Sequence, residues 1–159
     1  MAAKKKAKKA VRKTARKPAA KKRPAKKKRK QPETLRVRTV SAGLTVNDIQ
    51  KSIAWYRDVL GLFISDRWEQ DGKLMGVEMR AGHAAIWLGQ DDFAKGRDRV
   101  KGVGVRIYCR TAQDVDMLAD GIKARGGALD HEPRTQPWGG RDFGVTDPDG
   151  YKLTIASQS

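Results

Sequence analysis

The chain has 159 residues, with Lys or Arg at 35 positions and Asp or Glu at 18, and its formal net charge is +17. Residues 1–30 hold 17 of the basic residues and no acidic one, whereas residues 31–159 hold 18 of each sign. Cys109 is the single cysteine, which excludes an intrachain disulfide, and no apolar run approaches the ~20 residues of a transmembrane helix. The sequence therefore divides into a polycationic N-terminal segment and a neutral part that is long enough for one domain.

Residues 1–34 are rich in Lys, Arg, Ala and Pro and contain almost no large apolar side chain. Such a segment buries too little surface to offset its conformational entropy, so we expect it to be disordered. Its charge suits nucleic acid or another polyanion, bound without sequence preference because it has no aromatic side chain to stack on bases. The residues expected to contact phosphates are Lys4, Lys5, Lys6, Lys26, Lys27, Lys28, Arg29 and Lys30. The composition resembles the tails of histone H1 and of histone-like nucleoid proteins.

The remainder, residues 35–159, is predicted to fold as one domain, and its first half begins with a strand at 37–46. An amphipathic helix at 48–60 follows, which Asn47 or Asp48 caps and Gly61 ends. Three further strands are predicted at 62–68, 74–79 and 83–88. Residues 89–102 are charged and contain glycine, so they are interpreted as a linker in which Asp91 and Asp92 are solvated.

The same order of elements recurs after the linker, with the second helix starting 66 residues after the first. A strand is predicted at 103–109, a helix from Asp114 to Gly126, and strands at 128–131, 142–145 and 151–156. Two βαβββ units, at about 36–90 and 103–157, predict an α+β fold. We expect a curved mixed sheet with the helices outside and a concave cleft.

Two stretches, LTVNDIQKSIAWYRDVLGL and QPWGGRDFGVTDPDGYKL, carry a resemblance to a known family. They resemble the vicinal oxygen chelate (VOC) superfamily, which includes glyoxalase I, extradiol dioxygenases, fosfomycin-resistance enzymes and bleomycin-resistance proteins. The resemblance covers about residues 36–157 and implies paired βαβββ modules and a homodimer. In metal-dependent members it also implies ligands on four strands.

The four corresponding positions lack a strong metal ligand in this sequence. They are Ser41, Trp87, one of Gly104, Val105 and Arg106, and Thr154. Divalent metals with open positions prefer imidazole and carboxylate ligands, so we expect no metal and no cofactor. Whether the protein is an enzyme stays open, with a binding protein favoured.

Alternation along the strands places a set of side chains toward the expected cleft. The candidate ligand-binding residues are Ser41, Trp68, His83, Trp87, Trp138, Arg141, Lys152 and Thr154. Aromatic side chains with a few polar groups suit a planar or large organic ligand. The alternative to ligand contact for each Trp is packing in the core or at a dimer interface. For His83 the alternative is an ordinary hydrogen bond, and for Arg141 it is an ion pair with Asp142 or Asp147.

The favoured hypothesis is a metal-independent small-molecule-binding protein of this fold, similar to bleomycin-resistance proteins in sequestering a drug. It would be a homodimer without membrane contact, located in the cytoplasm and held on nucleic acid by its tail. That location would be the nucleoid in a bacterium or the nucleus in a eukaryote. One alternative is a glyoxalase-like lyase or isomerase with a non-standard active site. Another is a nucleoid or chromatin-associated protein whose domain only dimerises.

Overall fold

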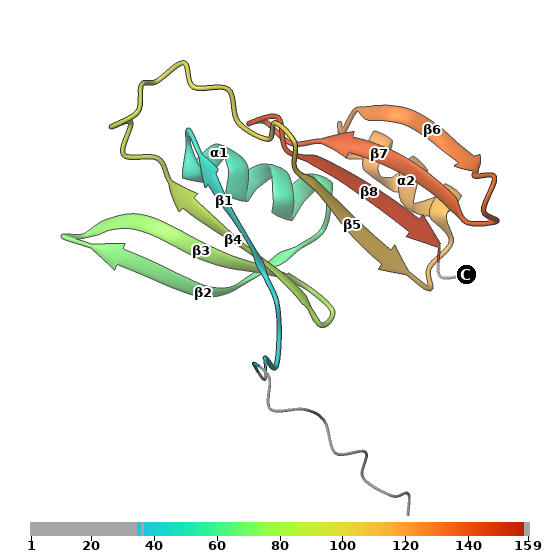
Figure 1. Ribbon diagram of the computed structural model, residues 1–159, viewed down its shortest axis with the longest axis horizontal. Helices are drawn as coiled ribbons and strands as arrows, with labels where there is room; N and C mark the ends of the chain where they lie inside the picture. Colours follow the sequence, from blue (N-terminus) through green and yellow to red (C-terminus); the bar gives the residue numbers. More distant parts are fainter. Residues whose placement is uncertain (1–34, 36, 158–159) are drawn as a thin grey trace, which may run out of the picture. The chain divides into compact units, whose positions relative to one another are not determined.

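The computed structural model describes residue 35 and residues 37–157 (Figure 1). The predicted basic segment, residues 1–34, including Lys4, Lys26 and Arg29, lies outside the described residues. Residues 37–157 form two four-stranded mixed sheets with helices, which confirms the predicted α+β fold of βαβββ modules. No helix in this part of the chain is long and apolar enough to cross a membrane.

The first half of the domain forms one sheet with the strand order β1-β4-β3-β2. Its elements are β1 (Ala42–Val46), α1 (Ile49–Ala54), η1 (Trp55–Val59), β2 (Phe63–Gln70), β3 (Lys73–Ala81) and β4 (Ala84–Gln90). β1 runs parallel to β4, and the other neighbouring strands are antiparallel. The helix between β1 and β2 therefore covers one face of the sheet and leaves the other free.

The second half repeats this plan with the strand order β5-β8-β7-β6. Its elements are β5 (Arg106–Thr111), α2 (Val115–Ala124), β6 (Leu129–Thr135), β7 (Arg141–Thr146) and β8 (Lys152–Ser157). β5 is parallel to β8, as β1 is to β4. Each half therefore has its first strand at an edge, paired in parallel with its last.

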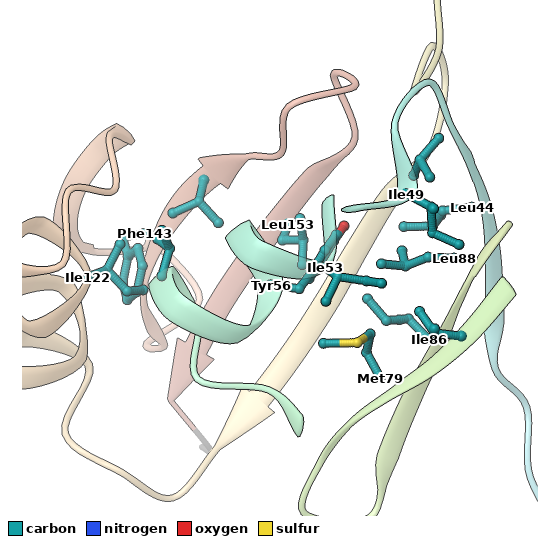
Figure 2. Packing of buried hydrophobic residues seen from close by; sticks show 14 of the residues in the cluster. Leu44, Ile49, Ile53, Tyr56, Met79, Ile86, Leu88, Ile122, Phe143 and Leu153 are labelled. Carbon is teal, nitrogen blue, oxygen red and sulfur yellow. The ribbon is translucent and has the colours of Figure 1, made fainter. Parts of the chain in front are cut away.

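The hydrophobic core lies between the helices and one face of each sheet. Burial alternates along β1, where Leu44 and Val46 are buried in this core, and Leu153 on β8 is buried in it too. Figure 2 shows Ile53 and Tyr56 of the first helical segment between residues of both halves, with Leu153 on one side and Leu88 on the other. One continuous cluster therefore serves both sheets.

Asp48 and Asp114 begin the two helices in the same way. Each carboxylate accepts hydrogen bonds from the backbone N–H groups two and three residues later, at 3.0 and 3.1 Å for Asp48 and at 2.9 and 3.0 Å for Asp114. These bonds satisfy N–H groups that have no partner within a helix. The predicted caps at Asp48 and Asp114 are confirmed.

Several elements differ from the prediction in their bounds or regularity. The first helix is not uniform, because after Ala54 it widens into the π-helical segment η1, where Leu60 N donates to Trp55 O over 3.4 Å. β1 begins at Ala42 rather than at residue 37. β5 begins at Arg106 rather than at residue 103, because a turn with Gly102 and Gly104 at positive φ precedes it.

The D-P-D-G turn, residues 147–150 just before β8, joins the two halves. The Tyr56 hydroxyl donates to Asp147 Oδ2 over 2.9 Å in a buried contact, and Ser52 Oγ donates to Asp149 Oδ2 over 3.1 Å. Asn47 N also donates to Asp149 Oδ1 over 2.8 Å. Burial raises the pKa of Asp147 above its usual value, although backbone N–H groups and the Tyr56 hydroxyl oppose that effect. The hydrogen bonds of this turn therefore connect the two halves, and we call this set of polar contacts the seam.

Candidate ligand-binding site

The sheet faces that point away from the helices differ between the two halves. On β4, Ile86 and Leu88 are buried on the helix side, and Trp87 between them is 36% exposed on the free side. On β8, Leu153 is buried on the helix side, whereas Lys152 on the free side is exposed. An exposed tryptophan therefore marks the free face of the first half, and an exposed lysine that of the second.

A hollow of about 300 Å³ lies on the free face of the first sheet. It is formed by residues 43–45 of β1, Trp68 of β2, Gly76 of β3 and residues 87–89 of β4, and we call it the aromatic hollow. Trp68, on the edge strand β2, is 55% exposed. Two indole side chains therefore border one open depression.

Glycine makes the floor of the aromatic hollow. A Cβ atom added at Gly43 or Gly89 would have no atom within 4 Å, which shows that open space lies above both residues. A Cβ atom at Gly76 would lie 3.4 Å from Trp68 Cε3, so the indole rests on this glycine. Glycine within a strand often marks close approach of another group, and here it allows a flat ring to reach the backbone.

Glu78 is the carboxylate beside Trp87, its register partner on the neighbouring strand. Its Oε2 accepts from Arg80 Nε over 2.7 Å and from Ser65 Oγ over 2.5 Å. The hydrogen bond from Arg80, with that from Ser65, lowers the pKa of Glu78 below its usual value. Glu78 is therefore a charged acceptor at the edge of the aromatic face.

The free face of the second sheet carries Arg106 and Lys152 as register partners on β5 and β8. Arg106 Nη1 donates to Thr154 Oγ1 over 3.0 Å, and Thr154 is 4% exposed. Lys152 and Arg106 line a second hollow of about 390 Å³ with residues 101–105 and Gly150, which we call the basic hollow.

The positions that hold metal ligands in metal-dependent VOC proteins do not fit a divalent ion here. Ser41 is exposed and precedes β1, and Trp87 offers no ligand atom. Thr154 offers a neutral hydroxyl that already accepts from the Arg106 guanidinium, whose positive charge opposes a cation at this point. Among the described residues, no three His, Cys, Asp or Glu side chains are grouped to hold a metal ion.

The structure brings together some of the predicted site residues. Trp68 and Trp87 share the aromatic hollow, whereas Lys152 lines the basic hollow and Thr154 lies beneath Arg106. Ser41, His83 and Trp138 are exposed and line neither hollow.

Two predicted residues are placed differently from the expectation. His83 occupies the turn between β3 and β4, so the alternation counted back from Trp87 does not apply to it. Arg141 lies on the helix side, where its Nη2 and Nε donate to both oxygens of Asp116 on α2 over 2.6 and 2.7 Å. The ion pair with Asp142 or Asp147, which was the alternative to ligand binding for Arg141, is corrected to one with Asp116.

The linker also holds a buried charge cluster that corrects the sequence interpretation of Asp91. This carboxylate is buried and lies 2.8 Å from Lys101 Nζ and 2.9 Å from Arg99 Nη2. Hydrogen bonds from Lys101 and Arg99 lower the pKa of Asp91 strongly. Lys101 is itself buried and also donates to Asn47, so the linker is tied to the end of β1.

The glycines of the aromatic hollow and Glu78 are functional candidates that the sequence analysis missed. Gly43, Gly76 and Gly89 each interrupt a strand pattern, which is a sequence sign of close approach to the backbone. Glu78 lies between the buried residues Val77 and Met79, so strand alternation places it on the free face. Cys109 lies on the helix side, and burial raises the pKa of its thiol, which disfavours the reactive thiolate.

Residues 38–155 match the family model described as the Glyoxalase/Bleomycin resistance protein/Dioxygenase superfamily. A search of curated proteins finds no match. Among solved structures, a glyoxalase/bleomycin resistance protein/dioxygenase from Nocardioides is similar with a TM-score of 0.61 and 16% identity, covering 79% of this chain and 86% of that one.

Two further solved structures are similar in fold. A member of the same superfamily from Sphaerobacter thermophilus has a TM-score of 0.61 and 22% identity, over 76% of this chain and 98% of the other. A virulence protein from Salmonella typhimurium has a TM-score of 0.59 and 22% identity, over 79% of this chain and 100% of the other.

Proposed function

The chain belongs to the glyoxalase/bleomycin resistance protein/dioxygenase superfamily, and within it we propose a metal-independent protein that binds and sequesters a planar organic molecule. The observation that carries this proposal is the aromatic hollow, where Trp68 and Trp87 border a floor of glycine backbone. Aromatic rings stack favourably on flat organic ligands, and such sites need few polar groups. The absence of suitable ligand atoms at Trp87 and Thr154 supports binding without a metal.

Tryptophan fluorescence and thermal-shift measurements test ligand binding. We expect bleomycin, or another compound in a panel of planar aromatic molecules, to quench the fluorescence saturably and raise Tm. Trp68→Ala and Trp87→Ala should each weaken binding by about tenfold, because each removes one stacking surface. Trp138→Ala is the matched control, since Trp138 is 75% exposed and outside both hollows. Equal losses in all three variants would contradict the assignment, as would a stoichiometric divalent ion required for binding.

We further propose that the polycationic segment tethers the domain to nucleic acid. Residues 1–30 hold 17 positive charges and no acidic side chain, so association should fall steeply with salt. Gel-shift titrations of the full chain and of a chain starting at Gln31 measure the contribution of the tail. Equal affinities, or an affinity insensitive to salt, would refute the tether. A ligand that acts on DNA would meet a higher local concentration of tethered protein.

A homodimer is proposed from uncovered apolar side chains before β1. Val37 and Val40 are largely exposed in a segment that the alternation assigned to a strand, but that has no strand partner among the described residues. A second copy of the chain would cover them. Sedimentation equilibrium of the protein and of Val40→Asp tests this, with a monomeric parent protein as the contradicting result.

A glyoxalase-like lyase or isomerase is the second candidate function, and Glu78 is the residue that supports it. The carboxylate lies beside Trp87 on the free face, where a bound ligand would meet it. Its lowered pKa makes it a weak general base near neutral pH, which favours binding over catalysis. Turnover of an α-ketothiohemiacetal that is lost in Glu78→Gln would establish the enzyme; no turnover leaves the binding function.

A further inference from the structure

The basic hollow is separate from the aromatic hollow and is built from other elements. It lies between the turn that precedes β5 and the start of β8, with a volume of about 390 Å³. Its lining consists of residues 101–106, Gly150 and Lys152, none of which lines the aromatic hollow. No acidic side chain is part of this lining.

Glycine geometry lets the two turns that border the basic hollow pack closely together. Gly102 has a φ of +72°, and a Cβ atom there would overlap the carbonyl oxygen of Gly150. Gly150 has a φ of +93°, and its own added Cβ atom would lie 3.2 Å from Lys101 O. The two turns therefore meet backbone to backbone, a contact that side chains at these positions would prevent. Val105 N donates to Gly102 O over 3.3 Å and closes the first turn.

Two cationic side chains point to the kind of ligand. Arg106 and Lys152 are register partners on parallel strands, and neither forms an ion pair with any residue that the structure describes. Like charges directly opposite on a sheet repel each other, and an anion between them removes that cost. Lys101 also lines the hollow, but Asp91 already neutralises its charge.

Arg106 is held in place while most of its donors stay available. One nitrogen, Nη1, donates to the buried Thr154 hydroxyl over 3.0 Å. A guanidinium has five N–H donors, so the others can meet a carboxylate or phosphate in the paired geometry that arginine favours. A fixed guanidinium loses less side-chain entropy when an anion binds than a mobile one does.

We propose that the basic hollow binds the oxyanion group, carboxylate or phosphate, of a small organic ligand between Arg106 and Lys152. The exposed apolar side chains of Val103 and Val105, which also line the hollow, would contact the organic part of that ligand. Thr154, placed where metal-dependent VOC proteins carry a carboxylate, serves here to orient Arg106. The second sheet would thus bind a negatively charged group through cationic side chains. This inference is independent of the ligand in the aromatic hollow.

NMR titration of the full ¹⁵N-labelled chain tests the proposal, because it separates this site from the polycationic segment. Inorganic phosphate, phenyl phosphate and benzoate are added at constant ionic strength while the Gly102 and Gly104 amide signals are followed. We expect saturable shifts, with phenyl phosphate or benzoate binding more tightly than inorganic phosphate. Benzyl alcohol, which lacks the negative charge, should cause none. The tighter of phenyl phosphate and benzoate identifies the oxyanion that the site prefers.

Substitutions assign the shifts to the two cations. Arg106→Gln and Lys152→Gln should each weaken binding by about tenfold, because each removes charge-assisted hydrogen bonds. Arg110→Gln is the matched control, since Arg110 is an exposed arginine on the same face of β5 but outside the hollow. Non-saturable shifts in the parent protein would overturn the proposal. An equal loss in Arg110→Gln would do so too.

Discussion

The two halves of the domain share a backbone plan and differ in the face that the helices leave free. Both have a parallel edge strand, an Asp-capped helix and an apolar face against one common core. On the free face, the first half has Trp68 and Trp87 over glycine, and the second has Arg106 and Lys152. The buried face therefore determines the fold, whereas residues of opposite parity on the same strands determine what each half can bind.

The glycines on the two sides provide the largest expected contrast. Gly102→Ala should lower the free energy of unfolding by about 3 kcal/mol, because the residue has positive φ and faces the Gly150 backbone. Gly43→Ala should change it by less than about 0.5 kcal/mol, since an added Cβ atom there meets open space. Urea unfolding measures both. Equal effects would mean that the two hollows do not differ in how tightly their backbones are packed.

The seam between the halves is tested by Tyr56→Phe, which removes the hydroxyl bound to Asp147. We expect a loss of about 2 kcal/mol near neutral pH, because a buried carboxylate loses a donor. Tyr108→Phe, at an exposed tyrosine, is the control and should have no effect.

The effect of Tyr56→Phe should depend on pH. Burial raises the pKa of folded Asp147 above its unfolded value of about 3.9, so the carboxyl costs stability as the pH rises through the folded pKa. Without the Tyr56 hydroxyl this pKa rises further. The loss should therefore be larger at about pH 7 than at about pH 4, where Asp147 is more protonated in both proteins. A loss independent of pH would show that the hydroxyl does not stabilise the ionised form.

The next largest expected effect is a change in ligand affinity of about tenfold, or ~1.4 kcal/mol. It is measured by titrating the ligands of both hollows into a variant of each hollow. Trp87→Ala should weaken binding of the planar aromatic compound and leave inorganic phosphate binding unchanged, while Lys152→Gln should do the reverse. Fluorescence and NMR titrations follow the two ligands. A variant that weakens both would show that the two hollows act as one site.

The smallest effect is expected for Arg141→Gln. The ion pair of Arg141 with Asp116 lies on the helix side and is exposed, so its loss should lower stability less than Tyr56→Phe does. Binding at both hollows should be unchanged in the titrations described above. Weakened binding of either probe would return Arg141 to the ligand-binding residues.

Local features of the sequence predicted much of the fold. The helix caps Asp48 and Asp114, and the faces of Trp87 and Leu153, follow from short-range hydrogen bonding and from strand alternation. Alternation holds only while the strand continues, which is why it failed for His83. Gly82 has a φ of +57° and turns the chain between that residue and the preceding strand.

Long-range pairing was beyond the sequence pattern. Several acidic residues are nearer to Arg141 in the sequence than Asp116 is. Asp116 comes beside Arg141 only in the folded chain, where β7 and α2 are neighbours. Charged residues in a linker are usually solvated, so nothing local indicated that Asp91 and Lys101 are buried together. The hollows likewise depend on which strands become neighbours. For example, β1 and β4 pair although they are the first and last strands of the first half.

The D-P-D-G turn has a consequence for folding cooperativity. Tyr56 in the first half and Asp147 in the second satisfy each other in a buried contact, and Arg125 Nε donates to Val59 O over 2.9 Å between the two helical regions. Either half alone would expose part of the shared core and leave these polar groups without their partners. The two modules, although repeated in plan, should therefore unfold in one transition, and fragments cut within residues 92–98 should gain structure on mixing.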